Sequence, residues 1–463
     1  MTPTTQQTQH AIIIGASMAG LWTAQALAPH FAKITILDRD QLPTEVVHRR
    51  GLPQAHHLHV LLARGVELLN DLFPGLHDEL VAAGANSFDL GSDINFHRND
   101  EWYPPFHTGI TGLSCSRLLL ETAVRHRVSQ NPNIQFITGA DVHSLITSAD
   151  NSQILGVRVN WRRGADQSAP KELHADLIID NSGRASRTPQ WLEELGYGQV
   201  EEIVVDAHLG YATRRYEKVA MPGCMLAAFA DENNPRGGMI IREENGGFVL
   251  TLGGTNDDRP PTDEAGFNEF IKDLPPEFSR ALRHAVPTSK ISGYRRTRNQ
   301  WRRFDKMPNW PDRFVVLGDA MCGFNPIYGQ GMTVAGLCAA TLGQMIADNN
   351  GQLDNLAHRY QKRIASIPSG ALELAITEDY RFPTTEGTYR RRGIHLIHRY
   401  FDIMSEAMKV SPFLYRRFIQ VQQLLKPAYS LFSPLALAHI AWGLVQLRRR
   451  PATAITQNRP AIA

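Results

Sequence analysis

The sequence predicts an α/β protein in which a parallel sheet is joined to an antiparallel sheet and a helical C-terminal region. Three observations support this class. A buried strand at 11–14 runs into a glycine-rich turn and a helix, and a second strand at 314–317 is followed by another such loop and helix start. Between them, residues 200–290 alternate as antiparallel strands do, and residues 346–463 read as helices.

The N-terminal segment has the spacing of a Rossmann-like βαβ unit. An apolar strand at 11–14 precedes Gly15, Ser17 and Gly20, and a second strand at 34–37 ends in Asp38. Gly15 permits a tight turn, Gly20 permits close helix–strand packing, and the middle position requires a small residue. An acid at the end of the second strand bonds a ribose. The dinucleotide contacts expected here are Gly15, Ser17, Met18, Ala19, Gly20, Asp38 and Arg39.

The second glycine-rich loop has the features of an anion site. Gly318-Asp319 ends a strand, and an acid there can hold polyol hydroxyls. The loop at 325–331 opens a helix, so its backbone N–H groups and the positive end of the helix dipole face an anion. The contacts expected here are Asp319, Pro326, Gly329, Gly331 and Met332.

Together the two motifs resemble those of FAD-dependent monooxygenases of the p-hydroxybenzoate hydroxylase type. The second motif favours FAD over NAD, because a nicotinamide dehydrogenase does not need it. Residues 180–187 resemble the middle motif of that family, with Ser182-Gly183 where Asp-Gly is usual. Residues 116–120 resemble the segment whose arginine reaches the flavin cofactor, so the resemblance adds Arg117, and also Val142, to the expected contacts. It implies the FAD-binding fold of glutathione reductase and p-hydroxybenzoate hydroxylase.

Residues 50–59 resemble a narrower subset that includes bacterial polyether epoxidases, with squalene epoxidase more distant. The resemblance implies that Arg50 and Gln54 contact the cofactor. His56, His57 and His59 raise the alternative of a metal site, but no fourth ligand is apparent and no metal is expected. Residues expected to line a substrate pocket are His57, Tyr211, Phe229 and Phe324.

The function implied is that of an FAD-dependent monooxygenase. In such an enzyme a C4a-hydroperoxyflavin, formed with O2, epoxidises or hydroxylates a substrate, here a lipophilic polyene, terpenoid or polyketide. NAD(P)H or a partner flavin reductase would supply electrons. No side-chain proton relay is apparent in the sequence, which favours an alkene, because epoxidation needs no base. Alternatives are an FAD-dependent reductase of isoprenoids similar to geranylgeranyl reductases, a flavin-dependent halogenase (whose W-x-W-x-I-P signature is missing) and a non-catalytic flavin-binding protein.

The motifs divide the chain into three parts. The FAD-binding domain is expected to be discontinuous, and segments of a substrate domain lie between its pieces. The expected ranges are 10–60, 110–185 and 290–345 for FAD binding, 60–109 and 190–290 for the substrate, and 346–463 for C-terminal helices. Asn245-Gly246-Gly247 is a predicted hairpin turn between two strands of the substrate domain.

Composition excludes several other classes. Hydrophobic residues make up 43% and charged residues 20%, as in a globular protein. The four cysteines form no CxxC pair and no signal peptide precedes the first strand, so a cytoplasmic location is expected. No nucleic-acid-binding motif is present.

The C-terminal region is basic and contains a long apolar stretch. No acidic residue follows Glu406, whereas eight Lys and Arg residues do. Residues 428–447 are apolar but contain Pro434 and His439, which argues against a simple membrane span and favours a surface-lying helix. Peripheral association of residues 407–463 with the inner face of the membrane is therefore expected. The alternative is a helical pair packed on the protein's own core.

Overall fold

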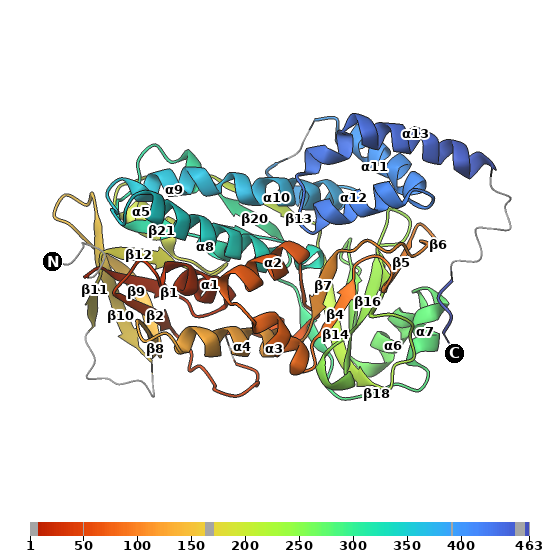
Figure 1. The fold of residues 1–463 in the computed structure, drawn as a ribbon, viewed down its shortest axis with the longest axis horizontal. Helices are drawn as coiled ribbons and strands as arrows, with labels where there is room; N and C mark the ends of the chain where they lie inside the picture. The colour runs from red at the N-terminus through yellow and green to blue at the C-terminus, as the bar shows by residue number, and fades with distance from the viewer. Residues whose placement is uncertain (1–7, 50, 163–170, 390–391, 450–458, 463) are drawn as a thin grey trace.

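The parallel sheet forms the centre of one half of the molecule (Figure 1). The computed structural model describes residues 8–49, 51–162, 171–389, 392–449 and 459–462. Across the sheet the strands are β21 (Phe314–Val316), β12 (Leu177–Asp180), β1 (His10–Ile14), β2 (Lys33–Asp38) and β8 (Ile134–Thr138), all parallel. Ile12 and Ile13, which point to opposite faces, are both fully buried, so the sheet is covered on each side.

Helices cover one face of this sheet and a small antiparallel sheet covers the other (Figure 1). The helices of this half are α1 (Met18–Leu27), α2 (Ala63–Leu72), α3 (Leu76–Ala82), α4 (Arg117–Ser129), α5 (Thr188–Glu194) and α8 (Gly331–Asp348). The small sheet is β11 (Glu172–His174), β10 (Ile154–Trp161) and β9 (Ala140–Thr147). A Cβ on Gly343 of α8 would lie 2.7 Å from the Ala26 carbonyl oxygen of α1, so glycine allows these two helices to pack closely.

An eight-stranded sheet forms the second half of the molecule (Figure 1). Its strands are β18 (Val286–Pro287), β14 (Gly210–Glu217), β17 (Phe248–Gly254), β16 (Arg236–Arg242), β15 (Met225–Ala228), β5 (Ile94–Arg98) and β6 (Glu101–Trp102), with β19 (Ser292–Tyr294) also on β14. Helices α6 (Glu264–Lys272) and α7 (Pro276–Leu282) bury Phe267, Phe270 and Phe278 in the cluster that covers one face of it. The turn predicted at 245–247 joins β16 to β17, with Asn245 at a φ of 57°.

Two strands fall outside the grouping expected from the sequence. β13 (Glu202–Asp206) lies in a separate sheet, ordered β22 (Cys322–Gly323), β20 (Asn299–Arg302), β13 and β23 (Glu386–Gly387). β19, expected in the FAD-binding part, pairs instead with β14 of the eight-stranded sheet. The alternation of apolar and polar residues identifies a strand but not the strand with which it pairs, because pairing joins residues far apart in the chain. A last small sheet is β3 (Val60–Leu61), β7 (Thr111–Ser114) and β4 (Asn86–Asp89).

The C-terminal helices lie across the end of both halves (Figure 1). They are α9 (Leu356–Ile364), α10 (Ser366–Asp379), α11 (Ile394–Met408), α12 (Pro412–Gln422) and α13 (Pro434–Arg449), with a 3₁₀ turn η7 (Ala428–Phe432). Pro434 begins α13 instead of interrupting it, as the missing N–H of proline allows at a first helical position. No described helix is long and apolar enough to cross a bilayer. The predicted fold class is confirmed.

Candidate cofactor and substrate site

A cavity of about 1230 Å³ extends from the N-terminus of α1, past the eight-stranded sheet, to the C-terminal helices. Ligand pockets are usually about 300–1,000 Å³, so this one has room for two molecules. Its lining contains every described residue expected to contact cofactor or substrate except Gly20, which lies just behind it. Arg50 lies outside the described residues.

The turn before α1 and the first turn of α1 each contain one position that admits only glycine. Gly15 has a φ of 105°, and a Cβ there would lie 2.6 Å from the Asn181 carbonyl oxygen. A Cβ on Gly20 would lie 1.9 Å from the carbonyl oxygen of Gly15. The chain can therefore turn sharply from β1 into α1, whose N-cap is Ser17, with Met18 and Ala19 on the cavity wall.

Asp38 closes the same end of the cavity from β2. Its carboxylate accepts hydrogen bonds from the backbone N–H of Ala16 and of Asp40, each at 2.8 Å. Arg49 lies 3.8 Å from it, and Arg39 is also on the wall. Arg49 was not predicted, and Arg50, which was, lies outside the described residues.

A buried cluster of charges joins α4 to α1 beside this end. Arg117, at the first position of α4, donates to the Ser17 hydroxyl and to Glu121, both at 3.0 Å, and contacts the sulfur of Met332. Arg49 pairs with the same Glu121 at 2.9 Å. Glu121 was not predicted, although an acid four residues after Arg117 on a helix lies on the same face.

The second glycine-rich loop forms the middle of the cavity. Asn325 caps the short turn η6 (Pro326–Tyr328), Gly329 follows at a φ of 65°, and α8 begins at Gly331. A Cβ on Gly331 would be 3.6 Å from an Asp319 carboxylate oxygen, so these two expected contacts are neighbours. The first backbone N–H groups of α8 have no partner within the helix, which makes this loop suited to a ligand oxygen.

The middle motif has a structural explanation that does not involve the side chain of Ser182. Asp180 is fully buried and accepts hydrogen bonds from the Ser182 N–H at 2.8 Å, the Ser186 hydroxyl at 2.5 Å and the Thr188 hydroxyl at 2.6 Å. The first acid of the motif thus holds its own loop. Arg184 extends from this loop to within 3.7 Å of Asp319.

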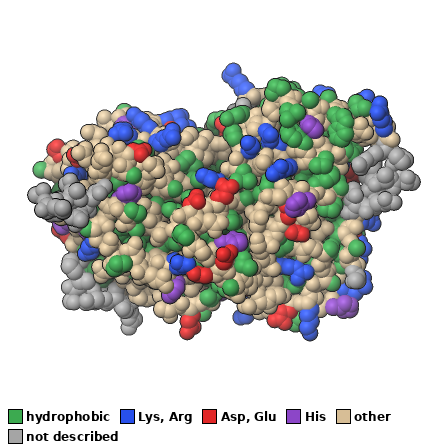
Figure 2. Space-filling view, in the orientation of Figure 1, with side chains coloured by type: hydrophobic (Ala, Val, Ile, Leu, Met, Phe, Trp, Pro, Cys, Tyr) green, Lys and Arg blue, Asp and Glu red, His purple; other side chains and the backbone are tan. Residues whose placement is uncertain are grey.

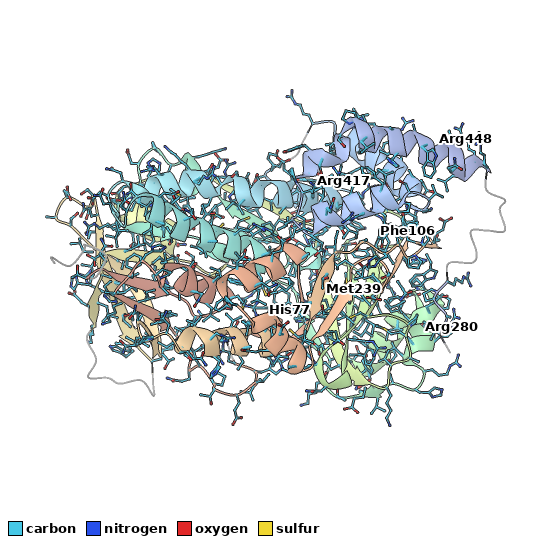
Figure 3. All side chains as sticks on the ribbon, in the orientation of Figure 1. His77, Phe106, Met239, Arg280, Arg417 and Arg448 are labelled. Carbon is cyan, nitrogen blue, oxygen red and sulfur yellow. The ribbon has the colours of Figure 1, made fainter. Side chains whose placement is uncertain are left out.

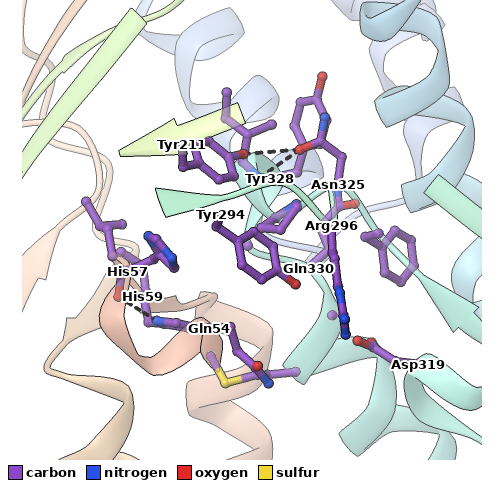
Figure 4. A pocket seen from close by; sticks show the side chains of 18 of the residues that line it. Gln54, His57, His59, Tyr211, Tyr294, Arg296, Asp319, Asn325, Tyr328 and Gln330 are labelled. Atoms are coloured by element: carbon purple, nitrogen blue, oxygen red, sulfur yellow. Dashed lines mark hydrogen bonds between the residues drawn. The ribbon is translucent and has the colours of Figure 1, made fainter. Parts of the chain in front are cut away.

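The substrate candidates lie farther along the cavity (Figure 4). His57 Nδ1 is 2.7 Å from the Thr213 hydroxyl, and its ring lies 5.2 Å from that of Tyr294. Burial, with smaller effects from His56 and Arg215, lowers the pKa of His57 to about 4, so its ring is neutral at pH 7. The ring of Phe229 packs against that of Phe96 in a tilted arrangement, with 5.2 Å between the ring centres. Tyr211 and Phe324, both buried, complete the set, whose roles remain predictions.

The three clustered histidines do not converge on one point. His57 bonds Thr213, whereas His59 Nδ1 lies 2.9 Å from the His57 carbonyl oxygen and His56 stacks on His48 at 3.8 Å. No group of three or more His, Cys, Asp or Glu side chains in the described parts of the chain is arranged to hold a metal ion.

Comparison with known proteins decides the family. The sequence matches the family described as FAD binding domain over residues 8–367. The chain belongs to this FAD-binding family. It is 31% identical to protein Rv3254 of Mycobacterium tuberculosis over 97% of this chain and 98% of that one.

Solved structures show the same fold. The flavin-dependent brominase Bmp2 is similar at a TM-score of 0.66 and 15% identity, over 96% of this chain and 100% of that one. PqsL of Pseudomonas aeruginosa, described as a probable FAD-dependent monooxygenase, gives 0.59 and 15%, over 85% and 100%. At such identities the likeness concerns the fold. Family and fold together indicate a flavin-dependent oxidoreductase. Neither of these two structures is of an epoxidase.

The residues present fit FAD. Asn181 Oδ1 and Gln330 Oε1 are buried at the cavity without a hydrogen-bond partner in the described chain, as expected where a ligand supplies the partner. Ser17 and the start of α1 would hold the diphosphate, and Asp38 the ribose. Asp319 and the start of α8 would hold the ribityl chain and the flavin ring. When bound, FAD supplies the redox chemistry that the side chains lack.

The C-terminal helices also contribute to the cavity, which the sequence analysis did not anticipate. Their inward side chains on the wall are Phe401, Met404, Met408, Tyr415, Phe418 and Ile419. The amphipathic pattern of α11 and α12 was a signal for burial. It could not show what the apolar side covers.

Proposed function

We propose that this protein is an FAD-dependent monooxygenase that epoxidises or hydroxylates a lipophilic polyene, terpenoid or polyketide. The observation that carries the proposal is the continuity of the cavity. It runs without interruption from the second glycine-rich loop (325–331, the flavin loop below) into a chamber walled by Met225, Met239, Phe401 and Met404. Such a chamber suits an apolar molecule placed beside the flavin.

Two properties of the chain support oxygen transfer. The start of α8 directs backbone N–H groups and the positive end of the helix dipole toward the place proposed for the flavin ring. Negative charge on the reduced ring would be stabilised there. The C-terminal helices form part of the chamber wall, and such a wall would help to keep water from the reacting atoms. O2 would be the co-substrate. NAD(P)H or a partner flavin reductase would supply electrons, since the sequence holds no second dinucleotide unit.

An FAD-dependent reductase of isoprenoid substrates is the second candidate. It would use the same apolar chamber and differs in forming no oxygenated product. Because Bmp2 shares only the fold and the W-x-W-x-I-P signature is missing, halogenation has less support.

Reaction of the reduced protein with O2 separates these functions. The FAD-loaded protein is reduced without oxygen, mixed rapidly with O2, and followed by absorbance. A transient near-ultraviolet absorbance before oxidised flavin returns is expected of a monooxygenase. Direct return of oxidised flavin, also with polyenes present, would favour the reductase. A protein that takes up no FAD would contradict both.

We also propose that the C-terminal helices dock on an anionic lipid surface. The exposed side of α13 is apolar over most of its length: Leu435, Leu437, Trp442 and Val445 are 53%, 48%, 47% and 44% exposed. Its opposite side packs on α11, where a Cβ on Gly443 would lie 2.9 Å from Ala407. Packing on the protein's own core therefore accounts for only one side of a helix that is apolar on both.

The charges around this face favour an anionic lipid surface as the partner. Arg448 and Arg449 end α13, and Arg417 lies on neighbouring α12 (Figure 3). Figure 2 shows hydrophobic side chains together with Lys and Arg over the C-terminal helices, at the upper right. An apolar face bordered by cations complements anionic lipid. A lipophilic substrate could then pass from the bilayer to the chamber on the inner side of the same helices.

Liposome co-sedimentation tests this docking. Wild type should bind vesicles containing phosphatidylserine and bind pure phosphatidylcholine weakly. The double variant L437E/W442E should lose binding, whereas Val286→Glu, an exposed valine on β18, should not. Absence of binding by wild type would contradict the proposal. A concentration-dependent dimer that the double variant abolishes, without lipid binding, would assign the face to a second copy of the chain.

A further inference from the structure

A chain of polar side chains crosses the cavity wall between the flavin loop and the C-terminal helices. The Tyr211 hydroxyl donates to Asn325 Oδ1 at 3.2 Å, as Figure 4 shows. The amide of Asn325 donates to Asp379 Oδ1 at 3.2 Å, and that of Asn299 donates to Asp379 Oδ2 at 2.7 Å. Tyr211, Asn325 and Asp379 are all buried, and all line the cavity. The chain thus places a carboxyl group in a mainly apolar wall.

Asp379 differs sharply from the carboxylate beside it. Glu378 pairs with Arg98 at 2.8 Å and with Arg381 at 3.1 Å. Among the described residues no cation pairs with Asp379, whose partners are two neutral amides. A buried carboxylate without a counter-ion is costly in its charged form. Its retention in the wall of a cavity therefore calls for a role beyond packing.

The surroundings of Asp379 bring its pKa close to neutral pH. Burial raises its pKa to about 7, against the opposing hydrogen bonds of Asn325 and Asn299 and with help from the charges of Glu378 and Asp206. Tyr211 and Tyr328 are the other titratable groups facing it. Arg98 and Arg381 instead hold the pKa of Glu378 below its ordinary value, although burial opposes them. When the pKa values of two adjacent acids are shifted in opposite directions, one can exchange a proton near neutral pH while the other stays ionised. This arrangement is typical of acid–base sites.

We propose that Asp379 is the acid–base group of this cavity and accepts a proton from a hydroxyl group of an otherwise apolar substrate. The substrate O–H bond breaks, an O–H bond forms on an Asp379 carboxylate oxygen, and the negative charge passes to the substrate oxygen. The inference rests on the proposed monooxygenase function and narrows its substrate to one that carries an enol or phenol. Such an anion is the electron-rich species that hydroxylation requires. No such base is apparent in the sequence alone, which favours an alkene instead.

A purely structural role is the competing explanation, because Asp379 also holds Asn325 at the start of the flavin loop. If Asp379 only held Asn325, the affinity for a ligand hydroxyl would not rise with pH. If Asp379 acts as a base, that affinity should rise as the carboxyl group ionises. Above pH 7 the carboxylate is charged and accepts a strong hydrogen bond from a hydroxyl. Below pH 7 it is neutral and accepts a weaker one.

Binding of 2-naphthol, a lipophilic phenol, to the FAD-loaded protein tests the proposal. The probe stays neutral at pH 6 and pH 8, and naphthalene serves as the probe without a hydroxyl. We expect 2-naphthol to bind about fivefold more tightly at pH 8 than at pH 6, and naphthalene equally at both. Asp379→Asn should keep the side-chain volume but bind 2-naphthol equally at both pH values. Asp402→Asn, an exposed partner of Arg381, should behave as wild type.

Infrared difference spectra provide a second test, which does not depend on ligand binding. A protonated carboxyl band that disappears between pH 6 and pH 8, assigned by its loss in Asp379→Asn where that variant folds, is expected. A carboxylate ionised throughout pH 5–9 would overturn the proposal, as would pH-dependent naphthol binding that persists in the variant, or no advantage of naphthol over naphthalene. None of these measurements uses O2, so their outcome is separate from that of the monooxygenase test.

Discussion

The guanidinium of Arg117 donates a hydrogen bond of 3.0 Å to the hydroxyl of Ser17, across the junction of α4 and α1. Ser17 in turn donates to Glu121 at 2.9 Å. A glycine at the middle position of the turn could make neither bond. The usual dinucleotide-binding pattern, G-x-G-x-x-G, has a glycine at this middle position. Serine in its place connects the turn to the buried charges of α4.

Replacing Glu121 by glutamine should destabilise the protein strongly. The side chain is 2% exposed and lies between Arg49 and Arg117, so the change leaves the buried Arg117 without its paired anion and leaves Arg49 only its longer contacts with Asp38 and Asp40. Breaking a buried pair in this way costs about 3–5 kcal/mol. Denaturant unfolding at pH 7 measures the loss. Glu79→Gln, which removes an exposed partner of Arg127, should change stability by less than about 1 kcal/mol.

The same substitution predicts a pH dependence. Burial opposes ionisation of Glu121, but Arg117 and Arg49 outweigh it and hold its pKa below the ordinary 4.5. The stabilisation is present above pH 4.5 and is lost as the pH falls through the folded-state pKa. The difference in unfolding free energy between wild type and Glu121→Gln should shrink in that acidic range. A difference that stays constant down to pH 3 would contradict the assigned pairing.

Gly331→Asp should abolish the yellow colour of the purified protein. The new carboxylate would occupy the start of α8, close to Asp319, and repel both that residue and an anionic or electron-rich ligand. Like-charge juxtaposition costs several kcal/mol, so the Kd for FAD should rise by at least about a hundredfold. Calorimetric titration with FAD measures it. Gly370→Asp on α10, where a Cβ meets nothing within 4 Å, is the matched control. A yellow Gly331→Asp protein would show that FAD binds elsewhere.

His57 should remain neutral throughout the physiological pH range. Burial is the main cause of its pKa of about 4, well below the ordinary 6.5. The unfolded chain binds this proton more readily than the folded protein does. The contribution of His57 to the free energy of unfolding is therefore fully present above pH 6.5 and declines as the pH falls toward 4. NMR titration of the ring, assigned with His57→Gln, should show protonation only near pH 4. Titration of the His57 ring near pH 6.5 would mean that it is open to water.

The cofactor half of the site was largely predictable because its determinants are local. Gly15, Ser17, Gly20 and Asp38 lie within one βαβ unit, where spacing along the chain determines spacing in the fold. Gly318 to Met332 likewise form one strand, one loop and one helix start. Steric limits on single residues, such as the φ of 105° at Gly15, act within such units and can be inferred from a short motif.

Three features depend on tertiary contacts: the pairing of Arg49 with Glu121, the membership of β19 in the larger sheet, and the cavity wall formed by α11 and α12. So does the polar chain, in which Tyr211, Asn325 and Asp379 come from three separate elements. The sequence by itself determined the family, the cofactor-binding units and the fold class, through backbone conformations and periodicities that neighbouring residues impose. Only the tertiary structure decided which side chains share the substrate cavity, because packing of distant segments sets both their approach and the burial that shifts the pKa of Asp379.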